Sequence, residues 1–217
     1  MRAGRSTAVA LVVATAAILG TTASAHRLDE YLQAARLAVE PRRVDLELDL
    51  TPGIAVADAM IADIDRDRDG VLSGNEKRGF AGRVLDAVVL ELDGRPLRLE
   101  PVGSTFPGLD DFRHGEGTIR LQSAAVLPRQ ADGEHQLSLR NMDQRDGSVY
   151  LANALVPNSD RIAIMAQRRD PAQRTLAIDY VLRPGPATPA PGWLLGGLAG
   201  LAVAAALLMR PPKMGVR

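Results

Sequence analysis

Short runs of alternating apolar and polar residues are the sequence feature that most limits how this chain can fold. In residues 43–50 an aliphatic side chain stands at every second position, and an acidic residue separates each from the next. A period of two is typical of a strand with one buried face. Further runs follow, and Asp-Gly pairs suited to tight turns separate several of them. These further runs are residues 88–94, 117–127, 135–142, 148–156, 160–167 and 175–183.

The runs together predict a mainly β domain of about seven or eight short antiparallel strands. The 217-residue chain has room for one such domain over residues 26–183. Short strands separated by turns are typical of two packed sheets, so we expect an antiparallel β-sandwich that resembles the immunoglobulin fold. The chain has no cysteine, so the domain must be stable without disulfides.

Residues 52–87 depart from this alternation. Apolar residues recur there at intervals of four on both sides of a short acidic segment, and that interval is typical of a helix with one buried face. We therefore expect a helix–loop–helix over residues 53–88, inserted between two strands. The helical positions are Val56, Met60 and Ile64, then Phe80, Val84 and Val88.

The acidic segment between these helices, Asp65–Glu76, has the spacing of a calcium-binding loop. Ca²⁺ takes roughly six to eight oxygen ligands, and a 12-residue loop supplies them from positions 1, 3, 5, 7, 9 and 12. Gly70 stands at position 6, where the chain turns sharply, and Leu72 at position 8 is suited to anchor the loop. The predicted ligands are Asp65, Asp67, Asp69, the backbone carbonyl of Val71, Ser73 through a water, and Glu76 with both oxygens.

The loop and its flanking helices resemble the EF-hand family over about thirty residues. The resemblance implies Ca²⁺ as the cofactor, and it disfavours Mg²⁺, which demands octahedral geometry and dehydrates reluctantly. Arg66 and Arg68 weaken the local negative field and should lower the affinity. An acidic turn that binds nothing is the alternative. The sequence has no second loop of this spacing, so a single hand must brace itself on its own sandwich or on a second molecule.

The N-terminal residues 1–25 have the layout of a secretory signal peptide. Two arginines precede an apolar stretch over residues 8–19, and Ala23-Ser24-Ala25 is a small-residue cleavage site. Removal of this segment would make His26 the first residue and would export the domain. An uncleaved signal anchor is the alternative.

The C-terminal residues predict a membrane anchor. Residues 184–192 form a Pro-rich stalk, and residues 193–209 contain no charged side chain over a length close to the minimum for a bilayer span. The basic residues of 210–217 place that tail in the cytoplasm by the positive-inside rule. We expect a single-pass protein of the bacterial inner membrane with its main domain in the periplasm. A removable sorting tail is the alternative for this segment.

The span also carries a possible contact face for a second copy. Gly192, Gly196, Gly200 and Ala204 recur at every fourth residue, which would let two helices approach closely and form a homodimer through the span. The abundance of Gly and Ala throughout this segment is a compositional alternative.

Composition and motifs exclude several other classes of protein. The 26 basic residues balance 26 acidic ones, and aromatic residues make up 3% of the chain, so we expect no nucleic-acid binding. The sequence contains no nucleophile elbow, no cysteine nucleophile and no phosphate-binding glycine loop, and we expect no enzymatic activity.

A copper or nickel site is the alternative metal function. After cleavage, His26 would offer an amine and its own imidazole, and a second histidine could complete the site. His114 and His135 are the other histidines, and neither has zinc-like spacing to a further ligand. Ordinary surface or strand-end roles for all three histidines are favoured.

Three segments resemble the exported leader domain of bacterial membrane proteins, including some of the HupE/UreJ nickel-permease type. They are residues 25–56, 115–121 and 148–157, and the resemblance extends over most of residues 25–182. It implies an exported β-rich domain that holds an EF-hand, and not transport, because a single predicted span follows the domain. We therefore expect a calcium-binding, membrane-anchored protein whose Ca²⁺ is structural or controls a surface for an unknown protein partner.

Overall fold

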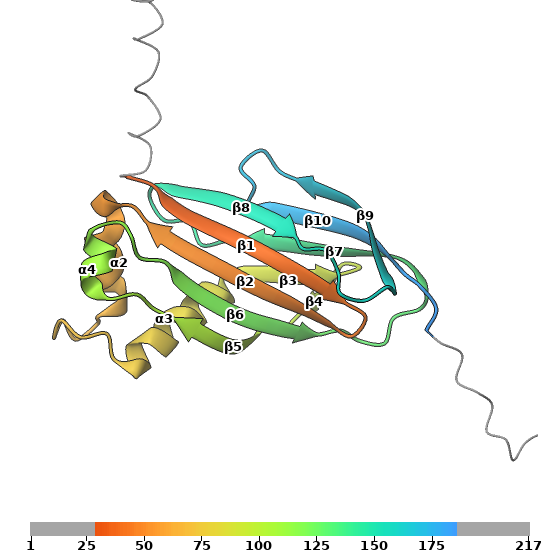
Figure 1. Cartoon of the computed structure of the whole chain (residues 1–217), viewed down its shortest axis with the longest axis horizontal. Coiled ribbons are helices and arrows are strands. Elements are labelled where there is room, and N and C mark those ends of the chain that lie inside the picture. The colour runs from red at the N-terminus through yellow and green to blue at the C-terminus, as the bar shows by residue number, and fades with distance from the viewer. Residues whose placement is uncertain (1–28, 186–217) are drawn as a thin grey trace, which may run out of the picture. The chain divides into compact units, whose positions relative to one another are not determined.

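The structure, a computed structural model, describes residues 29–185. These residues form a mainly β domain with two five-stranded sheets and three helices (Figure 1). The first sheet has the order β5 (Glu100–Thr105), β6 (Ile119–Val126), β2 (Arg43–Pro52), β1 (Tyr31–Glu40) and β8 (Ser148–Ala154). The second has the order β4 (Arg95–Leu97), β3 (Val88–Leu92), β7 (Gly133–Asn141), β10 (Thr175–Leu182) and β9 (Ile162–Arg169).

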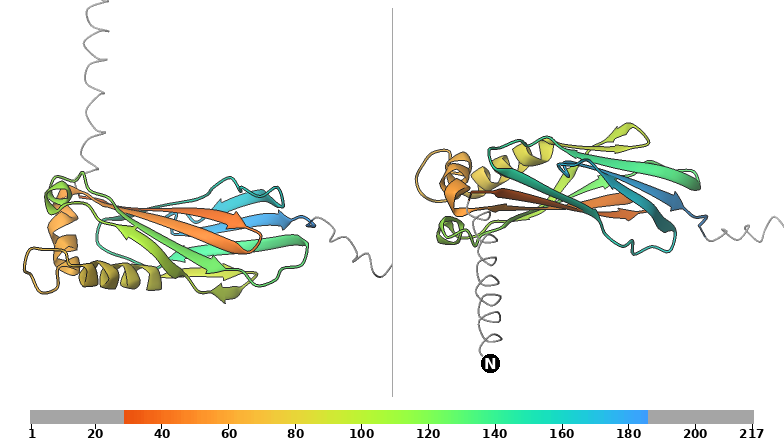
Figure 2. Two further views of the ribbon diagram at one scale, coloured as in Figure 1. Left: turned by 60° about the horizontal axis from the view of Figure 1, so that its bottom comes forward. Right: turned by 90° about the horizontal axis from the view of Figure 1, so that it is seen from above.

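The apolar alternation forms the strands because it gives each strand one buried face. In β2 every aliphatic position is buried, and the acidic residues between them are partly exposed. Leu48 and Leu121 of the first sheet belong to one core cluster with Leu90 and Leu139 of the second. Figure 2 shows the two sheets as facing layers. Each of the seven runs predicted from the sequence contains a strand.

Two features of the sheets differ from the prediction. The domain has ten strands among residues 29–185, since β1, β4 and β5 were not predicted. In addition, β1 pairs with β8 in parallel, with Tyr31 opposite Ser148, whereas every other described pair is antiparallel. The sandwich is therefore antiparallel-rich and not wholly antiparallel.

Gln33 explains why the sequence pattern of β1 is hard to recognise. It occupies an inward position and is only 1% exposed, yet it is polar. Its amide nitrogen donates to Ser148 Oγ at 3.2 Å and its oxygen accepts from Asn141 Nδ2 at 2.7 Å. These long-range hydrogen bonds satisfy the buried amide, so a strand forms where hydrophobic alternation alone does not predict one.

The outer edge of β8 is bonded to side chains from β9. The amide of Ala154 donates to Gln167 Oε1 at 3.1 Å, and Arg169 Nε donates to the carbonyl of Ala152 at 2.6 Å. Side chains thus take hydrogen-bonding positions that a further strand would otherwise occupy.

The helices lie at one end of the sandwich (Figures 1 and 2). They are α2 (Ile54–Ile64), α3 (Gly74–Asp86) and α4 (Leu109–Arg113). The predicted helix–loop–helix is present between β2 and β3, and the short α4 packs against α2 and was not predicted. Met60, Ile64, Phe80 and Val84 are buried as expected, but Val88 begins β3 and is not part of the second helix.

Within residues 29–185, no helix has both the length and the apolar content needed to cross a membrane. The predicted signal peptide, the span over residues 193–209 and the tail over 210–217 all lie outside the described residues.

Candidate metal centre

The acidic loop, residues 65–76, begins where α2 ends. The amide of Asp65 still donates to the carbonyl of Ile61 at 2.8 Å, so this residue closes the last turn of the helix. Its side chain turns inward and the residue is only 6% exposed. The amide of Gly70 donates to Asp65 Oδ2 at 3.0 Å, which folds the loop back over this carboxylate.

Gly70 has the backbone conformation that its position requires. Its φ is +80°, in the left-handed region that favours glycine, and a Cβ atom would meet no other atom within 4 Å. The sharp turn predicted at position 6 is therefore present. Glycine is favoured there by the backbone conformation and not by a lack of room for a side chain.

Glu76 closes the other side of the loop. Its Oε2 accepts from the hydroxyl of Ser73 at 2.7 Å and from the amide of Ser73 at 2.9 Å, while Ser73 caps the start of α3. Its Oε1 accepts from the amide of Arg66 at 2.7 Å, ten residues earlier. The hydroxyl of Ser73 and these amides lower the pKa of Glu76 to about 2. Glu76 therefore remains ionised and ties both ends of the loop together.

Three of the predicted ligands come together. Asp65, Asp67 and Glu76 each present a carboxylate oxygen, and these oxygens lie within 4.8 Å of one another. The hydrogen bond from the Asp69 amide acts to lower the pKa of Asp67, but slight desolvation and the carboxylates of Asp69, Glu76 and Asp65 together outweigh it, so the pKa is raised. Three converging carboxylates repel one another, and a hard cation would neutralise this repulsion with the oxygen ligands that it prefers.

One atom of this cluster stands out. Asp65 Oδ1 is buried and has no hydrogen-bond partner among the described residues, although the other oxygen of the same carboxylate is bonded to Gly70. A buried carboxylate oxygen without a partner is costly, and such groups are rare in folded proteins. A cation bound between Asp65, Asp67 and Glu76 would supply the missing partner, so these residues could hold a metal ion.

The other predicted ligands lie in the loop but outside this cluster. Asp69 Oδ1 accepts from the amide of Val71 at 2.7 Å, and the hydroxyl of Ser73 serves the helix cap described above. The side chain of Val71 points to solvent and is 63% exposed, which agrees with a role for its carbonyl and not for its side chain. Ligation by Asp69, Val71 and Ser73 remains a prediction.

Leu72 shows how a single helix–loop–helix is braced. This residue is 9% exposed and belongs to the same core cluster as the side chains of both sheets. The loop is thus anchored at position 8 on its own domain, which was one of the two arrangements expected from the sequence.

Sequence reasoning missed the contact that joins the helices to the sandwich. Asp63 lies two residues before the loop and accepts two hydrogen bonds from arginines. Arg145 Nη1 donates to its Oδ2 at 2.8 Å, and Arg83 Nη2 donates to its Oδ1 at 3.0 Å. Although partial burial acts to raise it, the pKa of Asp63 is lowered by the guanidinium groups of Arg145 and Arg83. Nothing in the spacing of these three residues identifies them as partners.

The histidines do not form a second metal centre in the described residues. His26 lies outside them. His135 Nδ1 lies 2.8 Å from Asp93 Oδ2, and its Nε2 lies 2.8 Å from the carbonyl of Ala131, so both ring nitrogens are engaged. His114 Nδ1 lies 2.7 Å from the carbonyl of Asp110. The acidic cluster of the loop is the group of potential metal ligands found in residues 29–185, and it contains no histidine.

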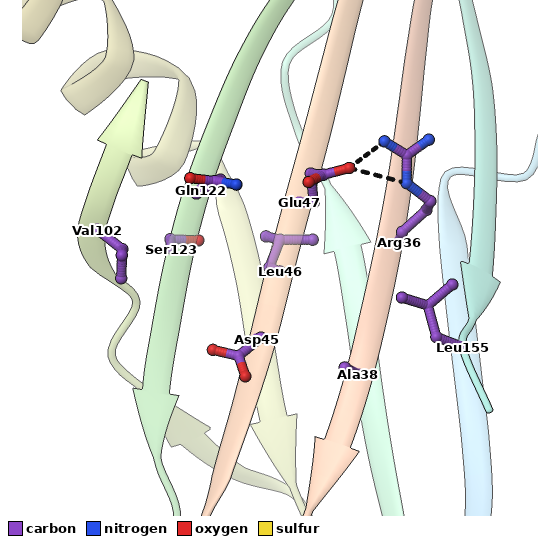
Figure 3. Close-up of a pocket in the computed structure, with 9 residues that line it drawn as sticks. All are labelled: Arg36, Ala38, Asp45, Leu46, Glu47, Val102, Gln122, Ser123 and Leu155. Carbon is purple, nitrogen blue, oxygen red and sulfur yellow. Dashed lines mark hydrogen bonds and ion pairs between the residues drawn. The ribbon is translucent and has the colours of Figure 1, made fainter. Parts of the chain in front are cut away.

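A shallow pocket on the first sheet offers no comparable chemistry. Figure 3 shows Arg36 and Glu47 bonded to each other across β1 and β2, with Leu155 on the side of Arg36 and Val102 beside Ser123 at the opposite side of the pocket. Arg36 Nη2 also lies 2.7 Å from Asp49 Oδ2. The charged side chains of this face neutralise one another, Arg36 across strands with Glu47 and Asp49, and Asp45 with Arg43 of its own strand.

The structure therefore defines a two-sheet β domain with one inserted helix–loop–helix and a carboxylate cluster in its loop. Comparisons with models of protein families, with curated proteins and with solved structures found no match.

Proposed function

We propose that this protein binds Ca²⁺ through the acidic loop, and that the bound ion stabilises the joint between the helices and the sandwich. The observation that carries the proposal is the buried, unpartnered Oδ1 of Asp65 beside the carboxylates of Asp67 and Glu76. Asp69, Val71 and Ser73 would complete the ligand set on binding.

The position of the loop favours a structural or partner-controlling role for the ion. Leu72 fixes one side of the loop to the core, and Asp63 joins the preceding helix to Arg145 in the segment between β7 and β8. A change in the loop would therefore be transmitted to the sandwich and not remain local. A surface for an unknown protein partner at this end of the domain would respond to the ion.

We further propose that the domain is exported and held at the bacterial inner membrane. The signal-like residues 1–25 and the uncharged residues 193–209 support this topology, as does the resemblance to exported leader domains of some HupE/UreJ-type proteins. We also propose that the sandwich resembles the immunoglobulin fold. Neither transport nor catalysis is part of it.

A thermal melt of residues 26–185 tests the calcium proposal. The fragment is melted in chelator, in millimolar Ca²⁺ and in millimolar Mg²⁺. A ligand at about 100 times its dissociation constant adds roughly 2.7 kcal/mol to the free energy of unfolding. For a domain of this size, the expected rise in melting temperature is about 5–10 °C with Ca²⁺ and much less with Mg²⁺.

Glu76→Gln is the diagnostic variant, because it removes one charge and the two-oxygen grip on the ion while keeping the side-chain volume. Most of the calcium-induced rise should vanish in this variant. If the parent and Glu76→Gln melt alike in all three solutions, the loop is an acidic turn and the proposal is wrong.

A further inference from the structure

The end of the domain from which the chain leaves β10 lies opposite the helices and the acidic loop (Figure 1). Several connections meet at this end. The amide of Arg183 donates to the carbonyl of Arg161 at 2.7 Å, and the amide of Leu127 donates to the carbonyl of Arg42 at 2.9 Å. We call this the exit end. It consists of residues 40–43, 126–132, 155–161 and 183.

The exit end carries the two most exposed large apolar side chains of the described residues. Val156 is 88% exposed and Val126 is 82% exposed. Val126 lies opposite Arg43 of β2, and Leu155, next to Val156, continues the pairing of β8 with β1. The two valines therefore flank the turn between β1 and β2 on the same end of the first sheet. Isolated apolar residues are common on surfaces, so this pair needs a second argument.

Charge supplies the second argument. Arg42, Arg129 and Arg183 are exposed at this end, and none of them pairs with a carboxylate within residues 29–185. A guanidinium group binds phosphate oxygens through two parallel hydrogen bonds, and its planar geometry matches them well. Arg183 Nη1 donates to the carbonyl of Asp160 at 3.0 Å, which leaves the charge of its guanidinium group without a carboxylate partner. Exposed valines beside arginines that lack a carboxylate partner are the chemistry that fits the headgroup layer of a bilayer.

The chain beyond the exit end supplies the third argument. Residues 184–192 separate it from the uncharged stretch 193–209, and nine residues extend over no more than about 30 Å. If that stretch spans the membrane, as proposed above, the exit end is tethered within reach of the lipid headgroups. The acidic loop belongs to the opposite end of the domain.

We propose that the exit end is a lipid-binding surface. Val126 and Val156 insert among the headgroups, and Arg42, Arg129 and Arg183 bind lipid phosphates. The domain would then stand on the bilayer with the acidic loop directed away from it. This inference rests on the proposed membrane anchoring and is independent of calcium binding.

The absence of cysteine allows a direct test on the full chain. Val126→Cys, Val156→Cys and Asp58→Cys are each labelled with an environment-sensitive fluorophore and reconstituted into phosphatidylglycerol–phosphatidylcholine vesicles. The vesicles also contain lipids with a quencher near the headgroup. Asp58 is the control, because it lies in α2 at the far end and its side chain is 86% exposed. Quenching at Val126 and Val156 should exceed quenching at Asp58 severalfold.

The arginines are tested in the Val126→Cys background. Arg42→Ser with Arg129→Ser should reduce quenching, whereas the matched pair Arg78→Ser with Arg113→Ser, at the helical end, should leave it unchanged. Equal quenching at the three labelled positions, or stronger quenching at Asp58, overturns the proposal. Unchanged quenching in the variant with Arg42→Ser and Arg129→Ser would show that these arginines do not bind lipid phosphates.

Alkaline carbonate extraction of the same vesicles separates the two proposals. A chain that is extracted is not anchored, and the membrane topology and the lipid-binding surface both fail. A chain that resists extraction while its valines remain no more quenched than Asp58 keeps its anchor, and the lipid-binding surface alone is wrong.

Discussion

Arg145 Nη1 lies 2.8 Å from Asp63 Oδ2, so a residue in the segment between β7 and β8 holds the last turn of α2. The same guanidinium group lies 5.3 Å from the ring centre of Phe80 in α3. One side chain from the sandwich thus contacts both helices that flank the acidic loop. Both partners of the ion pair are largely shielded from solvent, with side chains 28% and 26% exposed.

Arg145→Met should therefore destabilise the domain. It removes a charged hydrogen bond and leaves Asp63 partly desolvated without this partner, so the expected loss is about 1.5–3 kcal/mol of unfolding free energy. Urea denaturation of the parent, of Arg145→Met, of Asp63→Asn and of the double variant measures the coupling. Arg168→Met is the control, since the side chain of Arg168 is 56% exposed and its pair with Asp179 is screened by solvent. Strictly additive losses for Arg145 and Asp63 would contradict the finding.

The effect of Asp65→Asn on the melting temperature should have opposite signs with and without Ca²⁺. In chelator it relieves the repulsion among three carboxylates, keeps an oxygen for the Gly70 amide and adds donors toward its acidic neighbours, so the melting temperature should rise. In millimolar Ca²⁺ the variant should melt below the parent, because most of the gain of about 5–10 °C is lost. Asp58→Asn, an exposed residue of α2, should do neither. Equal destabilisation in both solutions would show that Asp65 supports the fold without a cation.

Substitution of two glycines by alanine distinguishes the cost of backbone strain from the cost of a steric clash. Gly70 and Gly147 both have positive φ, at +80° and +71°. A Cβ on Gly70 would meet nothing within 4 Å, whereas a Cβ on Gly147 would lie 2.5 Å from the carbonyl oxygen of Asp29. Gly70→Ala should cost about 1–2 kcal/mol from conformation alone. Gly147→Ala should cost more, because backbone must move as well, and equal losses in urea denaturation without Ca²⁺ would refute this distinction.

His135 should make stability depend on pH near neutrality. Both ring nitrogens face acceptors, Asp93 Oδ2 and the Ala131 carbonyl, and this arrangement suits the doubly protonated ring. Although burial acts to lower it, the pKa of His135 is raised by the Ala131 carbonyl and by Asp93. A raised pKa means that this stabilisation is fully present below the unfolded value of about 6.5 and is lost as pH rises through the folded pKa.

The free energy of unfolding of the parent should therefore fall as pH rises from the unfolded value of about 6.5 through the raised folded pKa of His135. His135→Gln removes the titrating group and should flatten this dependence. His114→Gln, at the C-terminal end of α4, should keep it. A parallel pH profile for the parent and His135→Gln, from urea denaturation at each pH, would contradict the assignment.

Local patterns predicted most of the strands and the helix–loop–helix. β2 was predictable because its burial repeats at every second residue. The helix–loop–helix was predictable because apolar residues recur at intervals of four on both sides of the acidic segment. The burial of Leu72 at position 8 and the positive φ of Gly70 at position 6 agree with that local prediction.

The remainder depended on contacts between residues far apart in sequence. Gln33 can be buried in β1 because Asn141 and Ser148 satisfy its amide, and neither is adjacent in the chain. Asp63 and Arg145 likewise form an ion pair although they are far apart in the sequence. Such pairs arise only after the sheets have assembled, so a scan for periodicity cannot detect them.

The parallel pair of β1 and β8 also delays completion of the first sheet during synthesis. β2 follows β1 directly, but the other edge of β1 has no partner until Ser148–Ala154 has been made, about a hundred residues later. For that interval β1 is an unpaired edge on a nascent chain, which is the kind of surface that promotes aggregation.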